Sequence, residues 1–256
     1  MLSRAEEKLV RALQRRKIRE AEHLFLAEGV RVVEALLDSG TDLRMALVAP
    51  SLEDTPRGRA LAQRLEAGTA VRRVDAHELE ALAGTESPQG VLVVAGIPRT
   101  ELEAIDLDGP GVVVALDGIQ DPGNFGVVVR SADAFGALFV AALPGTVDPW
   151  NPKAVRAAAG SSFRLPVVQV GTGPLVTWLR ERGFTIYGAD AAGASAEAHS
   201  LAQRAALVFG NEGAGLGAEV RSAIDELLAV PMRGGAESLN VGVAAGVLLY
   251  LLTRSL

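Results

Sequence analysis

Three separated stretches of the chain combine amide, carboxylate or guanidinium side chains with glycine, a combination suited to ligand binding. They read NFGVVVR (124–130), GNEGAGL (210–216) and VPMRGGAESLNVGVA (230–244). The second stretch follows an apolar run and precedes a helical pattern, which places its polar residues at the carboxyl end of a strand. Because α/β proteins bind ligands at that end of the sheet, we expect a binding site there.

The glycine-rich stretch 207–217 matches neither common nucleotide-binding loop. A P-loop requires a Gly-Lys pair, and the chain contains none. The dinucleotide fingerprint requires G-x-G-x-x-G after the first strand, whereas Gly213, Gly215 and Gly217 have another spacing and lie late in the domain. A conventional phosphate cradle is therefore disfavoured. Two interpretations stay open: the glycines let the backbone approach a ligand, or they only permit a tight turn.

Metal and hydrolase chemistry find little support in the residue types. The chain has no cysteine, and its three histidines, His23, His77 and His199, are isolated, without a second ligand at metal-binding spacing. No G-x-S-x-G nucleophile motif is present. We therefore expect no bound metal.

The polar residues of the first and third stretches also have simpler interpretations. Asn124 and Arg130 are six residues apart, about 120° around a helix, so they are not neighbours on one face unless Asn124 precedes the helix. Ser238 and Asn240 stand at the start of a helical pattern, where their side chains could cap free backbone N–H groups. For Ser238, capping and ligand binding are equally open.

The elements that must position these residues alternate between helix and strand. In the amino-terminal part, helical patterns cover 3–20, 29–40, 57–68 and 76–84, and strand-like runs cover 43–50, 70–75 and 90–97. This alternation predicts a mainly parallel sheet covered by helices. The polar, Pro- and Gly-marked stretch 98–110 has the composition of a linker.

A second and more apolar alternation follows the linker. Strands are expected at 111–119, 137–143, 164–170, 184–190, 205–210 and 226–232, and helices at 124–136, 151–161, 174–183, 217–224 and 238–253. Continuous apolar strands are typical of a sheet buried on both faces. We therefore predict two α/β domains, 1–97 and 111–256, joined by the linker 98–110.

The length of the apolar runs and the distribution of charge indicate where the protein is located and what it binds. The chain has 256 residues and a net charge of −6, and its longest apolar run, Val241–Leu252, is shorter than the roughly 20 residues of a membrane span. No secretory signal is visible, so we expect a cytoplasmic protein. The first twenty residues carry seven basic side chains against three acidic ones. A solvated helix face with i,i+4 ion pairs would account for that local excess.

Taken in order, the three stretches resemble the three motifs of the SpoU branch of the SPOUT methyltransferases. The family pattern is N-x-G-x-x-x-R, then N-E-G-x-G, then V/I-P-M followed by S-L-N-V, and all three occur here. One departure is Gly242, where many relatives have serine. A glycine there costs up to about 1 kcal/mol against alanine and allows close helix packing. The amino-terminal domain is similar to the substrate-binding domain of the rRNA ribose methyltransferases of this family.

The resemblance implies a carboxyl-terminal domain with a parallel sheet and a trefoil knot, beside a smaller amino-terminal α/β domain. It also implies S-adenosylmethionine-dependent methyl transfer to a ribose 2′-hydroxyl of RNA, with large-subunit rRNA as the favoured substrate. The enzyme would be a homodimer with its active site near the subunit interface. Two alternatives stay open: a tRNA substrate, and a non-catalytic RNA-binding or ribosome-assembly protein on the same scaffold.

Carried over by position, the resemblance implies a role for each of a set of residues. The catalytic set comprises Arg130, Asn124, Glu212, Ser238 and Asn240. The S-adenosylmethionine contacts comprise Phe209, Gly210, Asn211, Gly213, Val230, Met232, Ser238, Leu239 and Asn240. Among these residues Arg130 would also contact the RNA, and the basic charge of the first twenty residues adds Arg15, Arg16 and Arg19 as further predicted RNA contacts. The resemblance implies neither a metal nor a membrane.

Arg130 has two possible roles in such a reaction. Arginine holds its proton to very high pH, so it is a poor general base unless its surroundings are unusual. We favour a clamp on the adjacent phosphate that helps the hydroxyl lose its proton, and the role of base stays open. The sulfonium donor is already activated, so positioning is expected to provide much of the rate.

Overall fold

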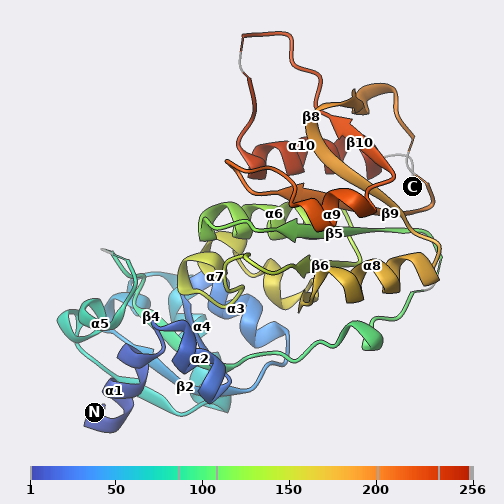
Figure 1. Ribbon diagram of the computed structural model, residues 1–256. Coiled ribbons are helices and arrows are strands. Elements are labelled where there is room, and N and C mark those ends of the chain that lie inside the picture. The colour runs from blue at the N-terminus through green and yellow to red at the C-terminus, as the bar shows by residue number, and fades with distance from the viewer. Residues whose placement is uncertain (1, 86, 108, 201, 236, 254–256) are drawn as a thin grey trace. The chain divides into compact units, whose positions relative to one another are not determined.

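The computed structural model describes residues 2–85, 87–107, 109–200, 202–235 and 237–253. The chain forms two compact units (Figure 1). Unit 1 comprises Met1–Arg99 and Trp150–Phe163, and unit 2 comprises Thr100–Pro149 and Arg164–Leu256. The segment Trp150–Phe163 therefore packs with unit 1, although the sequence pattern assigned it to the carboxyl-terminal domain. Its helix α7 (Pro152–Ala158) buries Val155 in the core of unit 1.

Unit 1 contains a four-stranded mixed sheet in the order β1-β4-β2-β3. Its strands are β1 (Leu24–Glu28), β2 (Leu43–Val48), β3 (Val71–Arg73) and β4 (Val91–Gly96). Strand β4 runs antiparallel to its neighbours β1 and β2, whereas the neighbours β2 and β3 form a parallel pair. The predicted mainly parallel sheet is therefore wrong for this unit. Alternation of helix and strand does not fix strand direction, because a helix need not carry the chain back across the sheet.

Both faces of this sheet are covered, and strand β1 shows it directly. Phe25 and Ala27 belong to one buried cluster, while Leu24 and Leu26 belong to another, as the two-residue period of a strand requires. Trp150 packs on Phe25 with ring centroids 4.9 Å apart. The covering helices are α1 (Arg4–Ala12), α2 (Arg16–Glu22), α3 (Val30–Asp38), α4 (Pro56–Gly68) and α5 (Ala76–Leu82), with α7.

The single helix expected over 3–20 is two helices, because the chain breaks between Ala12 and Arg16. The side chain of Arg19 turns inward at this break. Its Nη1 donates to the carbonyl oxygens of Leu13 at 2.8 Å and Gln14 at 2.9 Å. These bonds satisfy carbonyls at the end of α1 that no further helical turn could reach.

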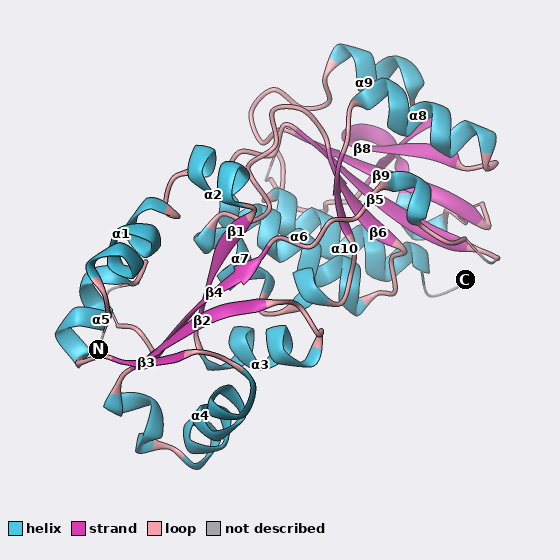
Figure 2. Ribbon diagram, turned by 90° about the horizontal axis from the view of Figure 1, so that it is seen from below, coloured by secondary structure: helices cyan, strands magenta, loops and turns pink. Residues whose placement is uncertain are grey.

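Unit 2 is built on a six-stranded parallel sheet in the order β10-β8-β9-β5-β6-β7. Its strands are β5 (Gly111–Asp117), β6 (Phe139–Ala142), β7 (Val167–Gln169), β8 (Thr185–Ser195), β9 (Arg204–Gly210) and β10 (Glu226–Ala229). Helices α8 (Thr172–Glu181) and α9 (Ala218–Ala223) cover one face, and α6 (Pro122–Ala134) and α10 (Val241–Thr253) cover the other (Figure 2). The predicted parallel sheet is confirmed for this unit.

Helices α6 and α10 approach closely because α10 carries glycine where they meet. A Cβ at Gly242 would lie 2.8 Å from Cγ1 of Val127, and one at Gly246 would lie 3.4 Å from Oγ of Ser131. The expectation that Gly242 allows close packing is confirmed. The segment expected as a linker also packs, since Leu102 is buried in the core of unit 2.

Candidate functional site

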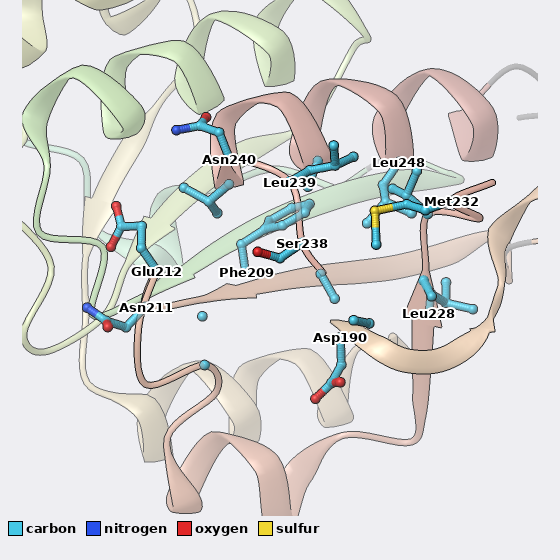
Figure 3. Close-up of a pocket in the computed structure, with 18 of the residues that line it drawn as sticks. Asp190, Phe209, Asn211, Glu212, Leu228, Met232, Ser238, Leu239, Asn240 and Leu248 are labelled. Carbon is cyan, nitrogen blue, oxygen red and sulfur yellow. The ribbon is translucent and has the colours of Figure 1, made fainter. Parts of the chain in front are cut away.

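A pocket of about 490 Å³ opens at the carboxyl ends of β8, β9 and β10 (Figure 3). It brings together residues of the second and third sequence motifs with the end of β8. Its walls combine apolar side chains with polar groups that face the same space. Of the predicted site residues, the pocket is lined by Phe209, Gly210, Asn211, Glu212, Gly213, Val230, Met232, Ser238, Leu239 and Asn240.

The loop after β9 is a compact turn closed by Asn211. Backbone hydrogen bonds join Asn211 and Gly215 in both directions, at 3.0 and 2.9 Å, and the side-chain Oδ1 of Asn211 accepts from the N–H groups of Gly213 and Ala214. A Cβ at Gly210 would lie 2.4 Å from the carbonyl carbon of Gly215. Glycine at position 210 thus serves the tight turn, and the same turn forms one wall of the pocket.

Two contacts fasten this loop to the end of β5. Strand pairing places Asp117 beside Gly210, and the Asp117 carboxylate accepts from the backbone N–H of Gly217 at 2.7 Å. Nδ2 of Asn211 donates to the carbonyl oxygen of Gly118 at 2.8 Å. Both ends of the loop are therefore hydrogen-bonded to residues at the end of β5.

Asn124 connects the three sequence motifs through its side chain. Its Nδ2 donates to Oε1 of Glu212 at 2.9 Å, and its Oδ1 accepts from Nδ2 of Asn240, also at 2.9 Å. Asn124 lies in the first turn of α6, which begins at Pro122 with Asp121 as its cap. One side chain of the first motif thus holds one residue from each of the other two.

Asn240 is also the residue that caps α10. Its Oδ1 accepts from the backbone N–H groups of Gly242 at 2.9 Å and Val243 at 3.3 Å. Ser238, which the sequence offered as a cap, has no hydrogen-bond partner among the described residues and lines the pocket instead. Capping therefore explains Asn240 and leaves the Ser238 hydroxyl available to a ligand.

The charged side chains that line the pocket are carboxylates. They are Glu212 and Asp190, and the described lining includes neither lysine nor arginine. Asp190 lies on β8 and is paired with Arg221 of α9 at 3.1 Å. The sequence analysis did not select Asp190, although its position in the strand-like run 184–190 was a usable signal. Such a pocket suits an aromatic ligand with cationic groups, and its described lining offers no cationic side chain to a phosphate.

Arg130 does not line this pocket. It lies on α6 about 9 Å along the helix axis from Asn124 and is exposed. Among the described residues it has neither a hydrogen-bond nor an ion-pair partner. The structure therefore brings Asn124, Glu212 and Asn240 together and leaves Arg130 on an open helix face.

The predicted RNA contacts near the amino terminus differ in their availability. Arg15 and Arg16 are exposed, and Arg16 pairs with Glu20 at 2.7 Å. Arg19 is only 1% exposed and is bound to backbone carbonyls, so its prediction as an RNA contact is wrong. A different set shares the outer face of this region, at helical spacing: Arg4, Lys8, Arg11 and Arg15, with Glu7 and Ala12.

The part of the chain that the structure describes contains no cluster of three or more metal-ligating side chains. No helix within those residues is long and apolar enough to cross a membrane.

Comparison with known proteins identifies the family and supports the fold. The model of the SpoU rRNA methylase family matches residues 111–250, and that of an MRM3-like substrate-binding domain matches residues 6–93. A 23S rRNA (guanosine(2553)-2′-O)-methyltransferase, RlmP of Bacillus subtilis, is 36% identical over 93% of this chain and 92% of its own. A 23S rRNA (uridine(2479)-2′-O)-methyltransferase of Streptomyces viridochromogenes is 30% identical over 90% of this chain and 82% of its own.

A solved structure gives the same result for the fold. The SpoU methyltransferase AviRb of Streptomyces viridochromogenes, in complex with S-adenosylmethionine, superposes with a TM-score of 0.89 at 30% identity. The match covers 99% of this chain and 98% of that one. With both domains matched by family models and a relative 36% identical over nearly its whole length, the chain belongs to the SpoU rRNA methylase family.

Proposed function

We propose that this RNA 2′-O-ribose methyltransferase uses S-adenosylmethionine to methylate one ribose of 23S rRNA. The observation that carries the proposal is the pocket of unit 2. Residues of the second and third motifs line it, and Asn124 of the first motif is hydrogen-bonded to two of them. Both relatives described above act on 23S rRNA, and both align with nearly the whole of this chain. The substrate would place the activity in the cytoplasm.

The pocket fits S-adenosylmethionine by its chemistry. Phe209, Leu239 and Val230 offer apolar surface for the adenine, and Gly210 and Gly213 line the pocket without a side chain that would occupy it. The carboxylates described above favour the positively charged part of the ligand. The same pocket includes the remaining predicted cofactor residues, Asn211, Met232, Ser238 and Asn240.

The protein contributes to the reaction mainly by orienting the methyl donor and the ribose hydroxyl. When bound, S-adenosylmethionine supplies a methyl group on an already activated sulfonium. Asn124 holds Glu212 and Asn240 in fixed positions at the border of the pocket, and Ser238 presents an unused hydroxyl there. Arg130 would bind the phosphate next to the target ribose and stabilise the hydroxyl oxygen as it loses its proton.

The exposed faces of α6 and α10 support a homodimer. Val127 is 42% exposed, Val243 is 52% exposed and Tyr250 is 56% exposed, and α10 is apolar on nearly every face. A helix with such a sequence is ordinarily covered all round. Arg130 lies one turn from Val127, so an interface here would place Arg130 beside it, at the edge of the substrate site.

We extend the proposal to the trefoil knot and to the RNA surface. Helix α10 packs against α6, and the strand before it, β10, lies at an edge of the sheet. The carboxyl-terminal segment therefore returns across the sheet, which supports the proposed knot. Arg4, Lys8, Arg11 and Arg15 form one basic stripe, which would contact the RNA backbone in place of Arg19. Within the stripe Arg11 pairs with Glu7, and Arg16 beside it pairs with Glu20.

Purified protein with labelled S-adenosylmethionine and unmodified transcripts of 23S rRNA and of tRNA tests the proposed function. Transfer to the 23S rRNA transcript alone supports it. Transfer to tRNA alone supports the tRNA alternative, and RNA binding without S-adenosylmethionine binding supports the non-catalytic one.

A further inference from the structure

Unit 1 contains a second cavity, of about 780 Å³, that is larger than the pocket of unit 2. Four parts of the chain form it: the start of α3 after Gly29, residues between Ser51 and Arg57, the residues Thr85, Ser87 and Gln89, and helix α7. All of them lie within unit 1. None of the three sequence motifs contributes to it, and the proposed methyl transfer does not use it.

A buried ion pair fixes one wall of this cavity. Glu28 is only 4% exposed, and its carboxylate accepts from Nη1 of Arg156 at 3.1 Å, from the backbone N–H of Gly84 at 3.0 Å and from the hydroxyl of Thr85. Nη2 of Arg156 also donates to the carbonyl oxygen of Gly84 at 3.2 Å. A Cβ at Gly84 would lie 2.9 Å from Nη1 of Arg156, so the guanidinium packs directly against the backbone of this glycine.

The pair leaves part of the guanidinium free for a ligand. A guanidinium has five N–H donors in one plane, and Glu28 and Gly84 engage only Nη1 and Nη2 of Arg156. The side chain is about one quarter exposed, so its remaining donors and its flat face can reach the cavity. Burying a carboxylate beside an arginine costs free energy unless both groups are well hydrogen-bonded. The Glu28 carboxylate meets this condition, because it accepts from Arg156, Gly84 and Thr85.

Two further arginines line the same space. Arg57 is fixed by Glu34, with Nε at 2.9 Å from Oε1. The raised pKa of Arg57, caused by its hydrogen bonds to Glu34, reflects the same contact. Arg31 is exposed and has no ion-pair or hydrogen-bond partner among the described residues. Ser51 and Ser87 add hydroxyl groups.

We infer that this cavity binds a nucleotide of single-stranded RNA, with its phosphate on Arg31 and its unstacked base against the guanidinium of Arg156. Planar guanidinium groups bind phosphate oxygens in pairs and stack on bases, and sequence-specific RNA recognition targets unstacked nucleotides. The hydroxyls and Gln89 offer hydrogen bonds to a base edge. The cavity has no aromatic side chain among its described lining, so its stacking surface is arginine.

This inference rests on the proposed function and adds a place where the RNA is read. The two relatives described above, which align with 93% and 90% of this chain, are named as acting on a guanosine and on a uridine. The chemistry at a ribose hydroxyl is the same for both, so the choice of target needs contacts away from the methyl-transfer site. The cavity of unit 1 provides such contacts.

The test compares three variants of the full-length protein in binding to an unmodified 23S rRNA transcript over a range of salt concentrations. Arg31→Gln removes one phosphate contact, and it should weaken binding about tenfold and lower the salt slope by about one. Ser51→Trp fills the cavity at an exposed position without changing charge, and it should weaken binding with the slope unchanged. Arg44→Gln removes an exposed arginine of unit 1 outside the cavity and is the matched control.

Binding of Arg31→Gln and Ser51→Trp at the level of Arg44→Gln would overturn the inference. S-adenosylmethionine binding, measured by calorimetry, should be unchanged in all three variants, which shows that unit 2 is intact. If the wild type methylates 23S rRNA and the cavity variants bind normally, the inference fails and the proposed function stands. If the cavity variants lose binding but the wild type transfers no methyl group, the proposed function fails and the RNA site stands.

Discussion

Nδ2 of Asn240 donates a hydrogen bond to Oδ1 of Asn124 across 2.9 Å, joining residues that are 116 positions apart in the chain. The other end of the Asn124 amide donates to Glu212. An amide is suited to this position because it offers a donor and an acceptor at once. The start of α6, the loop after β9 and the start of α10 are therefore held by one side chain.

Replacement of Asn124 should loosen the pocket without unfolding the protein. Asn124→Ala leaves Glu212 and Asn240 without their partner, and we expect S-adenosylmethionine affinity to fall about tenfold, as for loss of a hydrogen bond to a charged group. Asn124→Asp should be worse at pH 8, because a carboxylate would face that of Glu212. Calorimetric titration of both variants checks this, and equal affinity for the wild type and Asn124→Asp would contradict the role given to this residue.

Two glycines of the same loop should respond differently to alanine. At Gly210 a Cβ would lie 2.4 Å from backbone, whereas at Gly213 the nearest atom is 3.7 Å away. We expect Gly210→Ala to lower the free energy of unfolding by about 1–3 kcal/mol, as overpacking does, and to weaken S-adenosylmethionine binding. Gly213→Ala should match the wild type in denaturant unfolding. Similar behaviour of the two variants would show that the loop is not as tightly closed as described.

Arg130 should matter for turnover and not for cofactor affinity. It lies outside the pocket and is exposed, so Arg130→Ala should bind S-adenosylmethionine like the wild type and transfer no measurable methyl group. Arg130→Lys keeps the charge but not the paired donors, and should retain a small part of the activity. Single-turnover transfer and calorimetry separate the two effects. Full activity of Arg130→Ala would remove this residue from the mechanism.

The proposed dimer should depend on the open face of α10. Tyr250→Glu places a charge at a position that is 56% exposed in the single chain, and it should yield monomers in analytical ultracentrifugation. Tyr250→Phe keeps the apolar surface and should sediment like the wild type. A dimer that persists in Tyr250→Glu would locate the interface elsewhere.

Acid stability should report on Glu6. The backbone N–H of Ser3 and the Arg72 guanidinium lower the pKa of Glu6 from 4.5 to about 2. Because the pKa is lower in the folded state, ionised Glu6 stabilises the fold above about pH 4.5, and this contribution is lost as the pH falls from 4.5 toward 2. Glu6→Gln should therefore be less stable than the wild type at pH 7, and the difference should shrink with acid. Glu7→Gln, on the same helix and paired only at the surface with Arg11, is the control and should show little difference at either pH.

The sequence predicted unit 2 better than unit 1, for a physical reason. Continuous apolar strands such as β5 and β9 must be buried on both faces, so their pattern identifies a parallel sheet. In unit 1, β1 follows directly after a charged helix and was missed, and the direction of β4 leaves no trace in its composition. The return of Trp150–Phe163 to unit 1 depends on contacts such as that of Trp150 with Phe25, which no local pattern records.

The site shows the same division between local and distant information. Residues at strand ends and in glycine-rich turns, such as Phe209 and Gly210, were found because the motif and the local structure coincide. Asp190 was missed because a single aspartate at the end of a strand-like run belongs to none of the three motifs. Arg19 was misassigned because charge suggests exposure, whereas its guanidinium satisfies carbonyls at a helix break that the helical pattern hid.

Mapping of 2′-O-methylated nucleotides tests the central claim most directly. Unmodified 23S rRNA transcript would be incubated with the purified protein and S-adenosylmethionine, and the product analysed by nuclease digestion and mass spectrometry. The account predicts one ribose methyl group at one nucleotide, absent with Arg130→Ala and absent without S-adenosylmethionine. A methyl group on a base, or no methyl group on 23S rRNA from a protein that binds S-adenosylmethionine normally, would contradict it.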